Sequence, residues 1–385
     1  MTPAKVRLAM ASMGQSFSPC TRISLRLWLA KRIVFEWHRK KATNEKMSDV
    51  NIVFGGLPEE SDPEFENFWT RLQREFRLDE DDYLGHKRAN QASIEEGFGP
   101  ALDEMEKLHH LMVDATNWSS EVVNELLSED LEDDHAAQLL QTLIGLGARA
   151  LLAFDEITWL LKGGYPNGAL GRLRTLQEVH VVIAAITEYG DADGPHPDLL
   201  DRYLLHQEVF APQTAELLRA VGGDGIQEIL DDQVTTLLKR RKNQLLKRYG
   251  REFGTQWGWA SPLFKDGRAS FMRLNDLILP STSFLYGWSS HRLHASSEGL
   301  KEDALPQSEN RIGYSGSATD QGLYIPAVYA TTYLLAIASR IVPTKISKPE
   351  DSEPLETGRL FLGALHRTAE TVRNLWAMAD SHRKD

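Results

Sequence analysis

The chain has 385 residues, of which 42% are hydrophobic, and it carries a formal net charge of −12 at pH 7. This length and apolar content suffice for one large hydrophobic core or two smaller ones. The single cysteine excludes an internal disulfide framework and any cysteine-rich zinc site, and it fits a protein of the reducing cytoplasm. An acidic chain is a poor candidate for binding phosphate over its whole surface, although a local basic patch is compatible with it.

The first 46 residues differ from the rest of the chain in charge. They contain ten Lys or Arg residues and two acidic residues, so the remainder carries the whole acidic excess. The segment resembles a transit peptide in its Arg and Ser content, but the composition changes at Met47. We therefore expect residues 1–46 to be disordered or to precede the true start at Met47, and we exclude them from fold prediction.

A membrane-spanning helix needs about 18 consecutive apolar residues, and no charge-free stretch of the sequence approaches this length. The most apolar stretch, 139–161, contains Arg149, Asp155 and Glu156. It therefore predicts a helix of the protein core, and we expect no membrane partner.

Beyond residue 47, apolar residues recur at steps of three and four, which indicates amphipathic helices. The acidic stretch 130–134 suits a helix N-terminus, because the helix dipole favours anions there. In chain order the predicted helices cover residues 63–78, 99–112, 119–127, 134–161, 169–189, 197–221, 226–253, 283–297, 326–342 and 355–381, with short connecting elements at 257–264 and 271–279.

Glycine and proline mark the turn between two of these helices. Gly163 and Gly164 end the first, and Pro166-Asn167-Gly168 leads into the second, so the two helices form an antiparallel hairpin. No segment has a convincing strand pattern. The sequence therefore predicts an all-α fold, a multi-helix bundle with antiparallel helical hairpins and no significant sheet. The expected parts are the leader 1–46, a helical extension 47–130, a helical core 131–345, and a linker with a terminal helix at 346–385.

Two segments carry polar side chains at helical spacing among apolar neighbours. Arg174 and Glu178 lie one turn apart in the second helix of the hairpin, and Tyr286, Ser290 and His294 recur at the same step in 283–297. Because an unpaired buried charge is costly, such residues are paired or used. We therefore expect a candidate site at Arg174, Glu178, Ser290 and His294. Further candidate members are Glu156, Tyr203, His206 and Tyr286.

Each part of this cluster also has a purely structural interpretation. Arg174 and Glu178 could form an ion pair within their own helix. His294 could be a core histidine with its hydrogen bonds satisfied, and Ser290 could donate back to its own helix.

The segment EITWLLKGGYPNGALGRLRTLQE, residues 156–178, resembles the helical hairpin of a bacterial family, domain of unknown function 5677. The later segment YGWSSHRLHAS, residues 286–296, is similar to the aromatic–Ser–His helix of that family, and Gly322, Leu323 and Pro326 match a later helix start. The resemblance covers residues 134–338. It implies a helical fold in a bacterial protein, and it implies no established activity.

The sharpest enzymatic hypothesis is a metal-independent ribonuclease of the HEPN type, whose motif has an arginine and a histidine with four to six residues between them. Five residues separate Arg174 from His180. Positions six apart point about 120° away from each other on a regular helix, so these side chains converge only through a bend or a second subunit. A better chemical arrangement uses His294 as the general acid or base and Arg174 to hold a phosphate.

The predicted helix 226–253 concentrates seven Lys or Arg residues within thirteen positions. Such a run could follow a phosphate backbone, or it could be an ordinary solvated helix face. The phosphate-binding candidates are Arg240, Arg241, Lys247 and Arg248. No HExxH motif, nucleotide-binding glycine motif or serine-hydrolase elbow occurs, so we expect no metal and no cofactor.

The sequence thus favours a cytoplasmic helical accessory or defence-type protein whose polar cluster binds an anionic group or a nucleic-acid phosphate. The expected partner is RNA or another anionic ligand, and a homo-oligomer is compatible with the sequence. Two alternatives stay open, an HEPN-like ribonuclease and a structural or interaction module without catalysis. A ligand site would be open to solvent, whereas a structural network would be sealed and fully hydrogen-bonded.

Overall fold

The computed structural model describes residues 63–128, 134–191, 194–222, 229–293, 304–308, 311–314, 318–343, 345–347 and 352–382. The leader 1–46 and His294 lie outside these residues. The chain divides into two compact units, each described by itself. The larger unit consists of 61–197 and 271–385, and the smaller unit contains 198–270.

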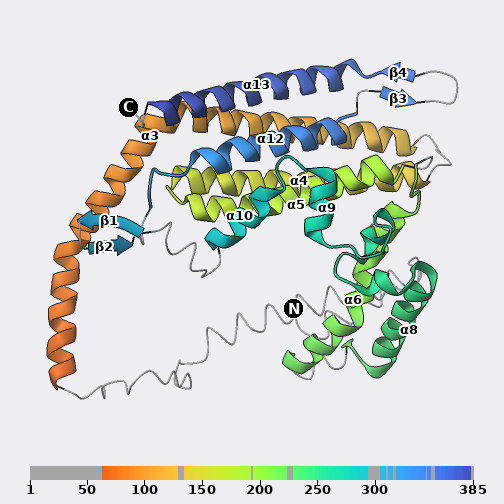
Figure 1. Cartoon of the computed structure of the whole chain (residues 1–385), viewed down its shortest axis with the longest axis horizontal. Coiled ribbons are helices and arrows are strands. Elements are labelled where there is room, and N and C mark those ends of the chain that lie inside the picture. Colours follow the sequence, from red (N-terminus) through yellow and green to blue (C-terminus); the bar gives the residue numbers. More distant parts are fainter. Residues whose placement is uncertain are drawn as a thin grey trace. The chain divides into compact units, whose positions relative to one another are not determined.

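The larger unit is a bundle of long helices with two short ones on its side (Figure 1). Its helices are α3 (Pro63–Ser128), α4 (Asp134–Lys162), α5 (Pro166–Tyr189), α9 (Phe271–Ile278), α10 (Phe284–Leu293), α12 (Tyr324–Ile341) and α13 (Glu356–Ser381). The smaller unit holds α6 (Leu199–Val221), α8 (Asp232–Tyr249) and two short 3₁₀ helices, η1 (Arg251–Gly254) and η2 (Gly258–Leu263).

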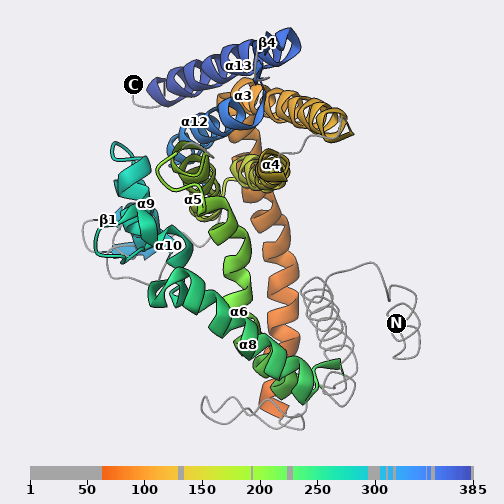
Figure 2. The same cartoon turned by 90° about the vertical axis from the view of Figure 1, so that its right-hand side faces the viewer.

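Helix α5 is the central element of the larger unit. It contacts α4, α12, α10 and α9, and Figure 2 shows it beside α4 with α12 close above. Its residues 181–186 are all buried, because the sequence VVIAAI is apolar on every side of the helix. A helix of this kind can exist in water only when neighbours cover it all round.

The turn between α4 and α5 confirms the predicted antiparallel hairpin. Gly164 adopts a φ of 76°, which only glycine reaches without strain. A Cβ at this position would also lie 2.8 Å from the carbonyl oxygen of Thr319. The Thr319 amide donates to the Gly164 carbonyl at 2.8 Å, so the tight turn also anchors the segment that leads into α12.

The prediction of three separate helices between residues 63 and 127 is wrong, because α3 is one helix of 66 residues. Figure 1 shows that it bends along its length. Pro100 lies inside the helix, where it lacks an amide hydrogen and disturbs the preceding turn, as helix-bending prolines do. Most residues between the predicted helices 63–78 and 99–112, such as Lys, Arg, Glu, Gln and Ala, are compatible with a helix, and they extend it.

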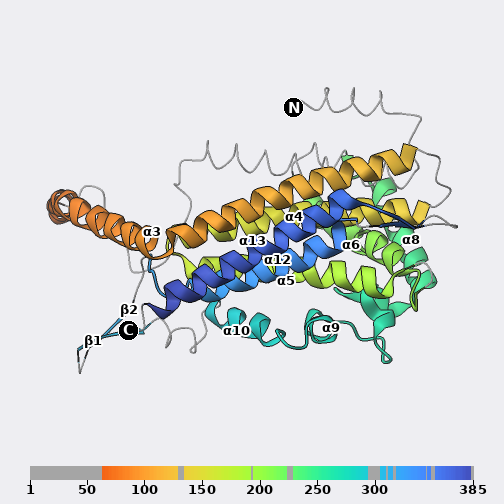
Figure 3. The ribbon, with the colours of Figure 1, turned by 90° about the horizontal axis from the view of Figure 1, so that it is seen from above.

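Helix α13 packs along α3, and Figure 3 shows the two helices running side by side. The Trp376 side chain is completely buried and its ring stacks on Phe98 at 4.8 Å between ring centroids. Near the start of α13, Phe361 lies against Trp118 of α3 at 5.8 Å. The terminal amphipathic helix predicted from the sequence is therefore part of the core.

The all-α prediction is confirmed. The strands of the described residues form two isolated antiparallel pairs, β1 (Ala304–Ser308) with β2 (Arg311–Tyr314) and β3 (Lys345–Ser347) with β4 (Ser352–Pro354). Both pairs lie in segments where the sequence predicted a loop or a linker. No helix in the described part of the chain combines the length and the apolar character needed to cross a membrane.

The smaller unit is built on the pairing of α6 with α8. Small and branched apolar residues form its core: Ala211, Ala215, Leu218, Leu230, Val234 and Leu238. Helix α8 ends at Gly250, whose φ is 93°. The chain then turns back through η1 and η2, so the predicted helix 226–253 is shorter than expected at both ends.

Two glycines of α13 give a test of how this helix packs in the larger unit. A Cβ on Gly358 would lie 2.0 Å from the Pro343 carbonyl oxygen, whereas a Cβ on Gly363 would meet nothing within 4 Å. We expect Gly358→Ala to lower the free energy of unfolding by about 2 kcal/mol, because the helix start must shift. Gly363→Ala should raise it by up to about 1 kcal/mol, because alanine is the better helix former. Urea denaturation of both variants measures the difference. Equal effects would show that α13 does not dock as described.

Candidate functional site

Arg174 and Glu178 of α5 both contact Tyr286 of α10. The Arg174 guanidinium carbon lies 4.1 Å from the centre of the Tyr286 ring, within the range of a cation–π interaction. The Tyr286 hydroxyl donates to a Glu178 carboxylate oxygen at 3.0 Å. The one-turn spacing read from the sequence therefore places both charged groups on one tyrosine, one over its ring and one at its hydroxyl.

The expected ion pair between Arg174 and Glu178 does not form. Among the described residues, no carboxylate is within salt-bridge distance of Arg174, and its Nε is buried without a hydrogen-bond acceptor. Both side chains are half-buried. The cation is thus held by an aromatic face, and no carboxylate in the described part of the chain pairs with it directly.

Burial raises the pKa of the Tyr286 hydroxyl above its ordinary value, and the nearby Glu178 carboxylate acts in the same direction. Hydrogen bonding to Arg174 opposes this shift. The hydroxyl therefore stays protonated at neutral pH, as a donor to Glu178 must.

A second polar contact fixes α9 against α5. The buried Gln177 side chain donates to the buried Asn275 amide oxygen at 2.9 Å. Asn275 in turn donates to the Ser283 carbonyl at 3.3 Å, just before α10. The apolar rim of the same region is completed by Phe271, whose ring lies 4.2 Å from that of Tyr286. These contacts position Tyr286 over Arg174.

For the other members of the predicted cluster that lie in the larger unit, the structure gives no contact with Arg174. Ser290 is half-buried on α10, and its neighbour Ser289 is the buried serine, which donates to the Tyr286 carbonyl at 3.1 Å. Glu156 pairs with Arg172 across the α4–α5 hairpin. The role of His294 stays a prediction, because this residue lies outside the described part of the chain.

His180 does not face the same neighbour as Arg174. Its ring is buried, with Nδ1 lacking a hydrogen-bond partner, and it lies 5.5 Å from the ring of Tyr333 on α12. Burial, aided by the Arg340 charge, lowers the pKa of His180 to about 4. Arg174 instead contacts α10, so the divergence expected for positions six apart is what the bundle shows.

Tyr203 and His206 belong to the smaller unit, where both make structural contacts. The Tyr203 ring packs edge-on against Trp259 at 5.2 Å. The Nε2–H of the buried His206 ring donates to the Thr255 carbonyl at 2.9 Å. The same ring packs edge-on against Phe210 and Phe253. Burial lowers the pKa of His206.

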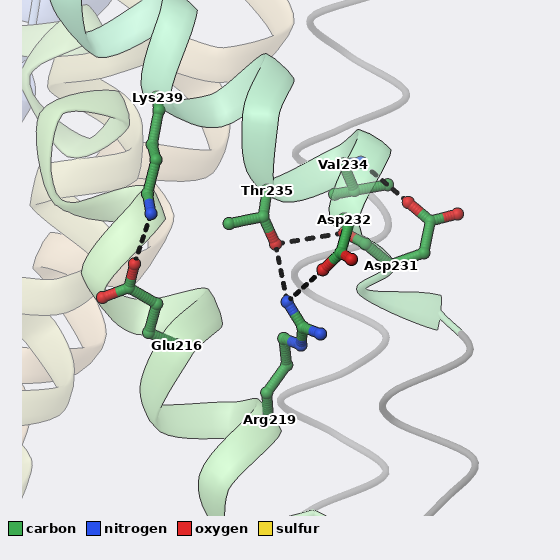
Figure 4. A network of polar contacts seen from close by, with 7 residues as sticks. All are labelled: Glu216, Arg219, Asp231, Asp232, Val234, Thr235 and Lys239. Atoms are coloured by element: carbon green, nitrogen blue, oxygen red, sulfur yellow. Dashed lines mark hydrogen bonds and ion pairs between the residues drawn. The ribbon is translucent and has the colours of Figure 1, made fainter.

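Five of the six basic residues of α8 fall into two groups. Lys239, Arg241 and Arg248 pair with carboxylates of α6, namely Glu216 at 2.8 Å, Glu208 at 2.6 Å and Asp201 at 3.7 Å. Figure 4 shows the first of these pairs beside a second contact between the same helices. There Arg219 of α6 donates to Asp232 at 3.0 Å, and Asp231 caps α8 by accepting from the Val234 amide at 2.8 Å.

The second group points into solvent. Arg240 and Lys247 are exposed and form no ion pair with any described residue. Of the four phosphate-binding candidates, Arg241 and Arg248 therefore help to hold α8 on α6, and Arg240 and Lys247 are available to an external anion.

Within the described residues, no group of three or more His, Cys, Asp or Glu side chains is arranged to hold a metal ion. A cavity of 590 Å³ lies at the start of α12, with Phe98, Asp320, Leu323 and Asp380 in its lining. No member of the Arg174 cluster lines it. Neither this cavity nor the Gln177–Asn275 contact was predicted from the sequence. Isolated amide residues carry no periodic signal, and the partners are far apart in the chain.

The buried His180 predicts a pH dependence of stability. Its pKa is lowered from 6.5 to about 4, so between these values the unfolded chain binds a proton that the folded chain excludes. The stabilisation is complete above about pH 6.5 and is lost as the pH falls through the folded-state pKa. It amounts to about 3 kcal/mol, since one pKa unit is about 1.4 kcal/mol.

Replacing His180 by Phe keeps a ring against Tyr333 and removes the titrating group. Between pH 6.5 and 4, we expect the free energy of unfolding of His180→Phe to fall by about 3 kcal/mol less than that of the wild type. Urea denaturation at several pH values measures this difference. His382→Gln, at an exposed site at the end of α13, is the control and should follow the wild type. A His180→Phe curve parallel to the wild type would contradict the burial of the neutral imidazole.

Comparison with known proteins gives one match. Residues 141–311 match the model of a family of unknown function, DUF5677, a segment shorter than the 134–338 of the resemblance. No curated protein and no solved structure matches the chain. The matched segment contains most of α4, the whole of α5 with Arg174 and Glu178, the described part of the smaller unit, and α9 and α10 with Tyr286. Over residues 141–311, this chain is therefore similar to the family of unknown function DUF5677.

Proposed function

We propose that this protein binds an anionic ligand through Arg174, with a phosphate group as the anion. The observation that carries the proposal is the state of the Arg174 guanidinium, which lies on the Tyr286 ring. Among the described residues it has no carboxylate partner, and its buried Nε has no hydrogen-bond acceptor. A half-buried cation without a counter-ion is unfavourable for folding alone. An external anion would supply the missing charge and the missing acceptor.

The geometry suits phosphate better than it suits a simple packing role. The Tyr286 ring covers one face of the guanidinium. The N–H donors that do not bond the Tyr286 hydroxyl lie in the plane of the group and are left for a ligand. Glu178 is engaged by the Tyr286 hydroxyl at 3.0 Å, which keeps the carboxylate from neutralising the arginine. A planar guanidinium with its donors available binds two phosphate oxygens at once.

The competing structural interpretation is an interhelical network in which Tyr286 simply joins α5 to α10. Such a network explains the Glu178 contact, but it leaves the Arg174 Nε buried and unsatisfied, at a typical cost of 1 to 3 kcal/mol, roughly. The two interpretations differ in what happens when arginine is removed. A purely structural arginine leaves ligand binding untouched.

Arg174→Gln tests the proposal against Arg172→Gln as the matched control. Arg172 is two residues away on α5 and pairs with Glu156, so the control removes the same charge from the same helix. With sodium pyrophosphate as the probe in isothermal titration calorimetry, we expect Arg174→Gln to weaken binding by about ten- to hundredfold, the value of a charge-assisted hydrogen-bond pair. Arg172→Gln should bind like the wild type.

Two results would count against an anion site at Arg174. One is wild-type protein that does not bind pyrophosphate, and the other is equal weakening by both substitutions. Thermal unfolding of each variant without the probe separates loss of the site from loss of the fold.

Binding of a nucleic-acid backbone by the smaller unit is a second candidate function. Arg240 and Lys247 carry it, because they are seven residues apart on α8 and so share one exposed face without ion-pair partners in the described part of the chain. Asn243 and Gln244 are exposed on the same side and add hydrogen-bond donors. The HEPN-like ribonuclease stays an alternative that requires His294, since His180 faces Tyr333.

The double variant Arg240→Gln/Lys247→Gln tests this second function. With a fluorescent single-stranded oligoribonucleotide in fluorescence anisotropy, we expect weaker binding and a salt dependence whose logarithmic slope is smaller by about 1.4, the value for two lost phosphate contacts. The charge-matched control is Lys87→Gln/Arg88→Gln, at two exposed positions of α3, and it should keep the wild-type slope. Identical slopes for both double variants would exclude the α8 face. Cleavage of the same oligonucleotide without metal, lost in His294→Ala, would favour the ribonuclease.

A further inference from the structure

Arg174 and Glu178 meet at a single atom, the hydroxyl oxygen of Tyr286. An Arg174 N–H donates to this oxygen, and the hydroxyl in turn donates to Glu178 Oε1 at 3.0 Å. Two hydrogen bonds of ordinary length that share one oxygen place their outer ends about 5 Å apart. The site therefore presents a cation and an anion side by side, with a tyrosine hydroxyl between them.

Each of the two charged groups has hydrogen-bonding capacity left for a ligand. Among the described residues no donor bonds the second carboxylate oxygen of Glu178, Oε2, and this oxygen is not buried. Of the guanidinium nitrogens of Arg174, only Nε is buried without an acceptor, so the others bond the Tyr286 hydroxyl or reach solvent. A ligand that approaches from solvent therefore meets N–H donors and a carboxylate acceptor in one place.

The Glu178 carboxylate decides which phosphate compounds suit this site. A phosphate held by Arg174 lies close to Glu178, and like charges at such short range repel each other. A plain phosphate therefore gains a guanidinium and is opposed by a carboxylate. A ligand that carries its own cation beside the phosphate turns this repulsion into an attraction. A charge that rejects one ligand and attracts another is a common source of specificity.

A primary ammonium is the cation that this carboxylate suits. It is compact and has three N–H donors, so it can bond Glu178 Oε2 while the Tyr286 hydroxyl stays on Oε1. A primary amine is protonated at neutral pH, because its pKa is about 10. With bonds of about 1.5 Å, a two-carbon link between a phosphate ester oxygen and an ammonium spans the distance between the two charges of the site.

We propose that the Arg174 site binds an aminoalkyl phosphate, with the phosphate on Arg174 and the ammonium on Glu178. The inference rests on the proposed function, because it takes Arg174 as the phosphate-binding group and adds the residue that selects the ligand. Tyr286 holds the guanidinium and the carboxylate apart, so that each can pair with the opposite charge of the ligand.

Two ligands that differ only in the ammonium test the role of Glu178. O-phosphoethanolamine carries the ammonium, and n-propyl phosphate has a methyl group in its place. In isothermal titration calorimetry of the full chain at neutral pH, we expect the wild type to bind O-phosphoethanolamine at least about tenfold more tightly than propyl phosphate. This ratio is the typical value of one hydrogen bond between charged groups.

Glu178→Gln should shift the two affinities in opposite directions. Glutamine keeps an acceptor oxygen for the Tyr286 hydroxyl and removes the charge. We expect the variant to bind O-phosphoethanolamine about tenfold more weakly than the wild type and propyl phosphate more tightly, because the repulsion is gone. Its binding of propyl phosphate also shows that the site is intact. A Glu178 that only supports Tyr286 would weaken both ligands alike. The matched control is Glu188→Gln on the same helix, whose carboxylate pairs with Arg340, and it should leave both affinities unchanged.

The outcomes separate this inference from the function on which it rests. Equal wild-type affinities for the two ligands, both lost in Arg174→Gln, would overturn the ammonium contact and leave the phosphate site in place. A wild type that binds neither ligand would overturn the proposed function as well. Co-sedimentation with phosphatidylethanolamine vesicles identifies the source of the ligand. Binding to the vesicles that Glu178→Gln weakens assigns a lipid headgroup, and binding of the free compound alone assigns a soluble aminoalkyl phosphate.

Discussion

The burial of α5 is the constraint on which the rest of the larger unit depends. Its residues 181–186 are apolar on all sides and all buried, so α4, α12, α9 and α10 must all contact it. Where a helix is enclosed in this way, its buried polar side chains cannot be satisfied by bulk water. Each needs a partner on the neighbour that it faces, and those partners decide the chemistry of the bundle.

The polar residues of α5 are accordingly sorted by direction. Arg174 and Glu178 turn to Tyr286 of α10, Gln177 turns to Asn275 of α9, and His180 turns to Tyr333 of α12. The Gln177–Asn275 contact is complete on both sides, as a structural hydrogen bond should be. Arg174 Nε and His180 Nδ1 both lack a hydrogen-bond partner among the described residues. Of these two groups only the Arg174 guanidinium is charged, and its incomplete contact separates a candidate binding site from an ordinary interhelical network.

Much of this arrangement could be read from the sequence, where the information is local. The Gly164 and Pro166 turn predicted the α4–α5 hairpin, and the four-residue step predicted that Arg174 and Glu178 share a face. The continuity of α3 could not be read in this way, because helix-forming charged residues resemble a solvated linker when no apolar stripe accompanies them. The meeting of Glu178 with Tyr286, more than a hundred residues later, depends on how α10 docks, and no periodic pattern encodes that. The contact of the Asn275 amide with Gln177 could not be predicted from the sequence for the same reason.

The order of elements along the chain has a consequence for how the protein folds. The segment Asp198–Ser270 of the smaller unit is inserted between α5 and α9. The residues of α9 and α10 that complete the Arg174 site are therefore far from α5 in the sequence. Closing a loop of this length costs conformational entropy, and the cost falls when part of the loop is already compact. The paired helices α6 and α8 have a local core of their own. If this insert folds early, the effective loop between α5 and α9 becomes shorter. The smaller unit would then lower the entropic cost of bringing α9 and α10 to α5.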